Sequence, residues 1–168
     1  MTISASIAGM MTRELRALKR ELEAYPNDAE IWRLAPPIAN SAGTLTLHLV
    51  GNLRHYVGAR FAGNGYVRNR DVEFRDRDIP GVELLARIDA TIRDVEAGLA
   101  RVTPAQLDQP FPELIAGMQV LTGDFLVHLA AHAAYHLGQV DYHRRLLAGS
   151  AVTIGAVAIS ELSTARKA

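Results

Sequence analysis

The chain has 168 residues, of which 49% are hydrophobic, so it is long enough to bury a core of its own and predicts a single domain. Its 18 basic residues balance its 18 acidic residues, which disfavours a nucleic-acid backbone or an anionic membrane surface as the partner. The absence of cysteine excludes disulfides, thiolate nucleophiles and zinc sites that use sulfur, and leaves histidine and carboxylates as the strong metal ligands.

Targeting and membrane signals are missing from the sequence. The first charged residue is Arg13, and no basic segment followed by an apolar run precedes it, so the start does not resemble a signal peptide. No apolar stretch approaches the roughly eighteen residues that a membrane-spanning helix needs. We therefore expect a soluble, cytoplasmic protein with no membrane partner.

Apolar residues spaced by three and four positions predict two long helices in the first part of the chain. The first covers about 3–25 and ends before Pro26. The second covers about 40–61 and is apolar nearly all round, which predicts burial on more than one side. A Gly-Asn-Gly sequence at 63–65 ends it, and a long loop of alternating charge is expected over 66–80.

The second part of the chain predicts two more long helices. The third begins at Pro80-Gly81, runs to about Val102 and is followed by a short helical turn at Thr103-Pro104. The segment 111–120 is ambiguous and compatible with extended chain. Thr122 is expected to cap the fourth helix, which runs to about 147, and the tail 151–168 is compatible with a last short helix.

These elements predict an all-α fold, a four-helix bundle with a long loop between the second and third helices. We expect one domain over 1–168, with its core at about 5–148 and a tail at 149–168.

Four of the six histidines fall on the fourth predicted helix, at 128–143. At about 100° per residue, His132 and His136 lie one turn apart within the core-facing stripe, so their imidazoles can bind one ion. His128 falls on the flank, and His143 lies nearly two turns beyond His136. The alternative interpretation is a pair of core histidines with hydrogen-bonded neighbours. It must satisfy every ring nitrogen, because each one left unpaired costs about 1–3 kcal/mol.

A metal site also needs a third ligand from a facing helix. His48 and His55 on the second predicted helix are the candidates. Both lie at the edge of the same apolar stripe, and the spacing alone does not separate them.

Three segments of the chain resemble the DinB/YfiT-like superfamily of metalloproteins, and the resemblance covers about 5–148. They are HLVGNLRHYVG at 48–58, YVRNRDVEF at 66–74 and HAAYHLGQ at 132–139. The resemblance implies a four-helix bundle that binds a divalent metal ion such as zinc or nickel. It also implies His48, His132 and His136 as the ligands, which leaves His55 as a bystander together with His128 and His143.

The resemblance implies several classes of activity. Relatives resemble thiol S-transferases or isomerases that use low-molecular-weight thiols, or metal-dependent hydrolases. Three neutral imidazoles leave an ion with its full charge and with open positions, as in catalytic sites. We expect a thiol S-transferase-type enzyme that acts on a small molecule, and the family implies a homodimer. A hydrolase or a non-catalytic metal-binding bundle is the alternative. Because the chain has no cysteine, a reacting thiol must arrive as a substrate.

Residues around the predicted ligands have two interpretations. Asn52, Tyr135 and Gln139 support the ligands from behind or simply pack between helices. The charged loop is a solvated rim of weak ion pairs, or a lid in which Tyr66, Arg68 and Arg70 bind substrate, with an arginine holding a carboxylate. The core face of the fourth helix carries no carboxylate, so a general base must come from this loop or from water.

Overall fold

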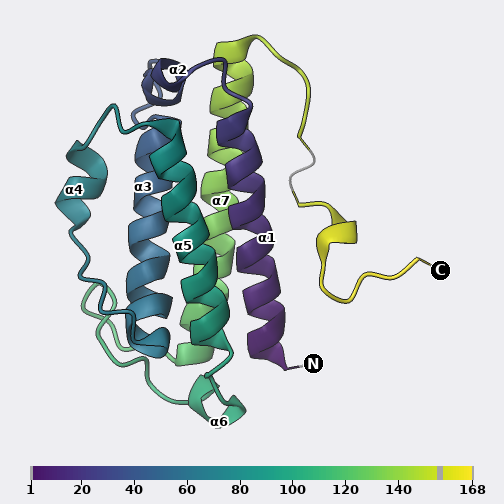
Figure 1. Cartoon of the computed structure of the whole chain (residues 1–168). Coiled ribbons are helices and arrows are strands. Elements are labelled where there is room, and N and C mark those ends of the chain that lie inside the picture. Colours follow the sequence, from purple (N-terminus) through teal and green to yellow (C-terminus); the bar gives the residue numbers. More distant parts are fainter. Residues whose placement is uncertain (1, 155–156, 168) are drawn as a thin grey trace.

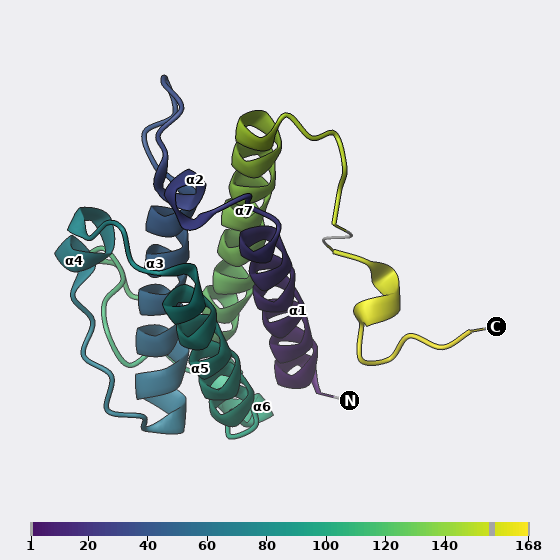
Figure 2. The ribbon, with the colours of Figure 1, turned by 45° about the horizontal axis from the view of Figure 1, so that its top comes forward.

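The computed structural model describes residues 2–154 and 157–167, and these residues form helices and loops. Four long helices lie side by side: α1 (Ile3–Glu23), α3 (Ala42–Leu53), α5 (Gly81–Leu99) and α7 (Thr122–Ala148) (Figure 1). α1 and α3 are each flanked by α5 and α7, so they lie diagonally opposite in the bundle (Figure 2). The described residues contain no β-strand, which confirms the predicted all-α fold.

The core forms where the apolar spacing predicted it. The predicted stripe of α1 is fully buried, as are the inward positions of α5. Every residue of α3 is buried, because α5 and α7 cover two of its sides and α4 (Arg70–Arg75) covers a third. The prediction of burial on more than one side of this helix is confirmed.

The second predicted helix changes character along its length. After α3, the chain continues as a π-helical segment, η1 (Arg54–Ala62), which ends at Gly63 with a positive φ of 69°. The left-handed conformation at this position suits glycine, which has no Cβ to clash. The predicted end of the helix at the Gly-Asn-Gly sequence is confirmed.

The loop expected over 66–80 is not structureless, and that expectation is wrong for its middle. α4 forms there, and its first turn is capped by the Asn69 side chain, which accepts a hydrogen bond from the Val72 amide. The residue that α4 buries is Glu73, a carboxylate. Hydrophobic periodicity does not mark a six-residue helix whose buried residue is charged, so the sequence pattern concealed it.

The other two connections between the long helices each contain one short helix. α2 (Asp28–Trp32) lies between α1 and α3, and α6 (Pro104–Leu107) begins at the predicted Thr103-Pro104 turn. The ambiguous segment 111–120 is a loop closed by two isolated β-bridges, Pro110–Leu121 and Ile115–Met118.

The start of α7 and the tail differ from the predicted elements. Thr122 is the first residue of α7 and not its cap; Leu121 holds that position without a side-chain hydrogen bond. In the tail, a single 3₁₀ turn, η2 (Ile159–Glu161), lies against α1 through the ion pair of Glu161 with Arg20 (3.0 Å). Residues 155, 156 and 168 of the predicted tail helix lie outside the described residues.

No helix among the described residues is long and apolar enough to cross a bilayer.

Polar contacts fix the position of α7 against α1 and its neighbours. The Arg144 guanidinium forms a buried ion pair with Glu21 and also donates to the carbonyl of Val152 (3.0 Å). The preceding residue, His143, accepts from the Tyr25 hydroxyl (2.7 Å) and donates to the carbonyl of Arg33 (2.9 Å). These bonds use both ring nitrogens of His143, and burial lowers its pKa, so the neutral ring serves the core.

The Arg144–Glu21 pair generates a stability prediction. The Arg144→Met substitution leaves a buried carboxylate without its cation, so we expect the free energy of unfolding to fall by about 3–5 kcal/mol. In the double variant Glu21→Leu/Arg144→Met both charges are gone, and most of that loss should return. Urea unfolding followed by circular dichroism measures both values. A double variant as unstable as Arg144→Met would show that the arginine acts through contacts other than this pair.

Candidate metal centre

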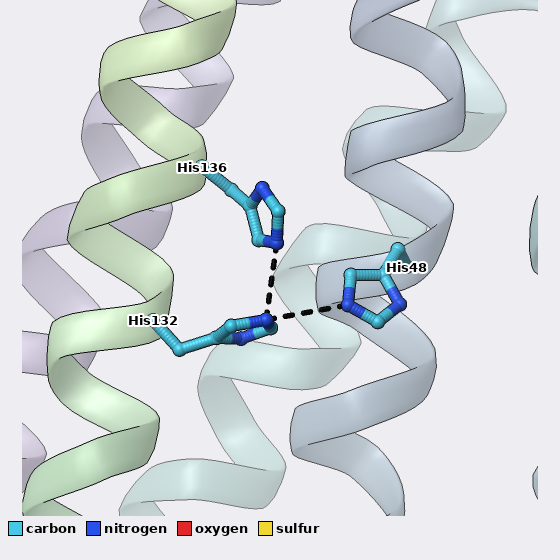
Figure 3. Close-up of side chains that lie close together, drawn as sticks. All are labelled: His48, His132 and His136. Carbon is cyan, nitrogen blue, oxygen red and sulfur yellow. Dashed lines mark hydrogen bonds between the residues drawn. The ribbon is translucent and has the colours of Figure 1, made fainter. Parts of the chain in front are cut away.

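Three histidine side chains meet between α3 and α7. His48 comes from α3, and His132 and His136 project from successive turns of α7 (Figure 3). The Nε2 atom of His132 lies 3.4 Å from that of His48 and 3.0 Å from that of His136. These are the residues that, among those described, form a group of candidate metal ligands, with their ligand atoms within 4.8 Å of one another.

The hydrogen bonds of the Nδ1 atoms of His48 and His136 determine which nitrogen of each ring carries its proton. His48 Nδ1 donates to the Glu73 carboxylate (3.0 Å), and His136 Nδ1 donates to the Gln139 side-chain oxygen (2.6 Å). A neutral imidazole carries one proton, so the Nε2 atoms of both rings present lone pairs to His132. The third ring can donate its single proton toward one of them, which leaves at least one lone pair without a proton.

The rings on α7 are held in their neutral form. Burial lowers the pKa of His132 to about 4, and the positive charge of nearby groups adds to this effect; in order of size, these groups are His136, His48, His128 and Arg68. Burial also lowers the pKa of His136. Neutral imidazole is the form that ligates a metal ion. At neutral pH, His132 and His136 are therefore in the protonation state that can ligate a metal ion.

The distances fit one shared ion. Zinc–nitrogen bonds of about 2.0–2.1 Å at tetrahedral angles separate two ligand nitrogens by about 3.4 Å. The observed separations of 3.4 and 3.0 Å fall at or slightly below that value. The buried Nδ1 atom of His132 has no hydrogen-bond partner, so the surroundings do not assign this ring another polar role. The three histidines could hold a divalent metal ion.

Comparison with known families agrees with this geometry. Residues 9–140 match the sequence profile of the DinB superfamily. The chain belongs to the DinB superfamily. The match confirms the resemblance drawn from the three sequence segments, and the structure brings together the three histidines that the resemblance implied. A search of curated proteins found no match.

Behind His48, this DinB-superfamily chain places a buried acid–base pair. Arg68 grips Glu73 through two hydrogen bonds, of 2.7 and 2.8 Å, and the same carboxylate receives the His48 proton. Burial alone would raise the pKa of Glu73, but the bonds from Arg68 and His48 lower it. The carboxylate thus stays charged and fixes both the orientation and the tautomer of His48, as partners of metal-bound histidines commonly do.

The Glu73 side chain can lie against α3 because Gly51 has no side chain at that point of the helix. A Cβ atom at this position would collide with the Glu73 carboxylate. Phe74, the next residue of α4, places its ring 5.1 Å from the His48 ring and covers it. Glu73 lies within the second of the three family-like segments, but its role was not predicted from the sequence. Glu73 is one acid within a segment of alternating charge, so hydrophobic periodicity does not mark it as buried.

The three residues expected behind the ligands have different surroundings. Gln139 bonds His136, as described above. Tyr135 is 65% exposed and meets the His136 ring edge-on, with 5.3 Å between ring centres. Asn52 is buried one turn beyond His48, and its Oδ1 atom has no hydrogen-bond partner. Contact with a ligand is therefore direct for Gln139 and Tyr135.

The loop residues expected to bind substrate are engaged with other groups. Arg68 is committed to Glu73. The Arg70 guanidinium lies over the Phe74 ring at 4.8 Å, and the Tyr66 ring lies under Arg54 at 4.7 Å. A substrate carboxylate would have to compete with Glu73 for Arg68, whereas exposed Arg70 is the more accessible cation. The binding of substrate by these three residues stays a prediction.

The other three histidines lie outside the cluster. His55 bonds Glu113 (3.0 Å), which also pairs with Arg60, and His143 belongs to the core network near Arg33. His128 is exposed and stacks on the His132 ring with 5.9 Å between ring centres. The spacing could not separate His48 from His55, but the structure does, because His55 bonds Glu113 of the 111–120 loop.

Glu73 can be tested through metal affinity. In Glu73→Gln the charge that orients His48 is lost, and we expect zinc to bind about 10–100-fold more weakly. Competition with a chromophoric chelator measures the dissociation constant. The matched control is Glu83→Gln, which removes an exposed carboxylate of α5 that pairs with Arg87. Equal affinities for wild type and Glu73→Gln would contradict the positioning role.

Proposed function

We propose that the chain is a divalent-metal-dependent enzyme that transfers a small thiol to an electrophilic substrate, with zinc or nickel held by His48, His132 and His136. The observation that carries the proposal is the convergence of three imidazole Nε2 atoms with at most one proton among them. A bound dication would supply charge that favours the ionised form of a thiol at neutral pH.

The surrounding side chains perform the supporting chemistry. Glu73 and Gln139 each accept the Nδ1 proton of one ligand ring, so they keep the Nε2 lone pairs of His48 and His136 directed inward. Arg68 holds Glu73 in its charged form. Phe74 shields His48 from one side, which limits competition by water. This preorganised set needs no rearrangement when a substrate enters.

The state of Glu73 favours a thiol over water as the nucleophile. Hydrolysis benefits from a general base that accepts a proton near the site. Glu73 is the carboxylate that touches a ligand ring, and its lowered pKa and its bonds to Arg68 make it a poor proton acceptor. A thiol, whose ordinary pKa is about 8.5, needs much less help to ionise than water does. This difference supports the transferase over the hydrolase.

In the proposed transfer, the thiolate sulfur forms a bond to an electrophilic carbon of the substrate. The bond from that carbon to its leaving group breaks, and the leaving group departs with the electron pair. The thiol proton goes to solvent. The thiol and the electrophile are both small-molecule partners, and the homodimer that the family implies stays a prediction.

The metal claim has a direct test. Protein purified without a polyhistidine tag and supplied with zinc or nickel should hold about one ion per chain by elemental analysis. His132→Ala and His136→Ala should each weaken binding by about 100-fold or more, because two imidazoles are too few for a tight site. His128→Ala is the matched control, since it removes an exposed histidine from the same helix. Less than about a tenth of an ion per wild-type chain would refute the site.

The reaction class needs a separate assay. A haloaromatic electrophile is incubated with a panel of small thiols, and an activated ester without thiol reports hydrolysis. We expect turnover that requires both a thiol and the metal and that His132→Ala abolishes. Ester hydrolysis without thiol, at a comparable metal-dependent rate, would favour the hydrolase, and metal binding without either activity would favour a binding protein.

A further inference from the structure

A cleft adjoins the three histidines at the α2 end of the bundle. Its volume is about 370 Å³, and it lies between the chain at 38–40, the first turn of α3 and the last turns of α7. Leu45 and His143 are its buried residues, Asn40 is half-buried, and its exposed walls are formed by Ile38, Ala39, Gln139 and Tyr142.

The cleft and the histidine cluster share structural elements. Leu45 precedes His48 by three residues on α3, and Gln139 follows His136 by three residues on α7. Three residues of helix advance about 4.5 Å, so the cleft begins one helical turn from the level of the ligands. Gln139 connects the two directly, because it lines the cleft and accepts the Nδ1 proton of His136.

The lining of the cleft selects a neutral ligand. None of the residues that line it is an acid, a lysine or an arginine. His143 is the titratable ring in the lining. Its two nitrogens are bonded to Tyr25 and to the Arg33 carbonyl, and its pKa is lowered, so it presents a neutral aromatic face. An anionic group would therefore find no counter-charge here and would have to shed its hydration.

The volume of the cleft and the polar group of Gln139 further restrict the class of ligand that it can bind. An apolar cavity of about 150 Å³ accommodates benzene, so the cleft has room for one aromatic ring with substituents. Tyr142, which is 72% exposed, offers a ring face for stacking. Because the oxygen of the Gln139 amide is used by His136, the group it presents to a ligand is its NH₂ donor.

We propose that this cleft binds the electrophilic substrate of the enzyme, a neutral, ring-sized apolar molecule with a hydrogen-bond acceptor that reaches Gln139. The assignment as the electrophile's site rests on the proposed function. The binding of a neutral aromatic molecule does not, since the cleft is formed by residues other than the three ligands.

The test measures binding of two matched probes by fluorine NMR: para-fluorobenzyl alcohol, which is neutral, and para-fluorobenzoate, which is anionic. The full chain is used in metal-free and zinc-loaded forms. We expect the alcohol to bind both forms and, in ¹H–¹⁵N spectra of the labelled protein, to shift the side-chain NH₂ signal of Gln139. In the metal-free form the benzoate should bind about tenfold more weakly or worse, a difference of about 1.4 kcal/mol.

Two variants locate the probe. Ala39→Trp fills the cleft from an exposed position, and Tyr142→Ser removes its aromatic wall. Each should weaken binding of the alcohol by about tenfold. Ala105→Trp places the same indole on α6, at the opposite end of the bundle (Figure 1), and should leave binding unchanged.

The outcomes separate this inference from the proposed function. Failure of the alcohol to bind, equal binding of the benzoate to the metal-free form, or unchanged binding in both cleft variants would each overturn the cleft assignment, whatever the metal does. If the alcohol binds but the chain takes up neither zinc nor nickel when they are supplied, the cleft assignment is supported and the metal-dependent enzyme is refuted.

Discussion

The structure depends on the meeting of three imidazole nitrogens between two helices. The Nε2 atoms lie 3.0 and 3.4 Å apart, and at such distances their lone pairs repel one another unless a proton or a cation lies between them. The single protons of the His48 and His136 rings are on Nδ1, where they bond Glu73 and Gln139. A bundle that needed these positions only for packing would gain more from apolar residues, which have no polar atoms to satisfy. The arrangement is costly in an empty core and favourable around a cation.

The same constraint explains why a charged residue of α4, Glu73, is buried against α3. To keep its proton on Nδ1, His48 needs an acceptor, and Glu73 can be buried there because Arg68 neutralises it. Gly51 provides the space. The arrangement has four parts: the candidate ligand His48, its acceptor Glu73, the cation Arg68, and the space left by the absent side chain of Gly51. Each satisfies a polar or steric requirement created by another, which is why a short α4 is ordered within a segment rich in charge.

Much of the fold was predictable because it follows from apolar spacing. The stripes of α1 and α5, the all-round burial of α3 and the end of η1 at Gly63 appear in the sequence as periodicity or as glycine. α4 was not predictable this way, since its buried residue is an acid whose partners lie on α3 and in the preceding loop. The choice of His48 over His55 likewise needed the family resemblance, because both lie on one edge of the same stripe. Glu113, which engages His55, comes from a loop whose position no periodicity defines.

The commitment of Arg68 to Glu73 also changes where the proposed substrate is expected to bind. An arginine in the charged loop suggested a clamp for a carboxylate, but a carboxylate of the chain already occupies Arg68. A substrate carboxylate that displaced Glu73 from Arg68 would weaken the hydrogen bond between Glu73 and His48. Binding at Arg68 would therefore disturb one of the three candidate metal ligands. The cleft at Gln139 imposes no such conflict. A neutral molecule held there leaves the Glu73–Arg68 pair intact, and a hydrogen bond from the Gln139 NH₂ group reinforces the orientation in which its oxygen holds His136. In the proposed cleft, substrate binding would therefore support the orientation of His136, whereas in an arginine clamp it would disturb that of His48.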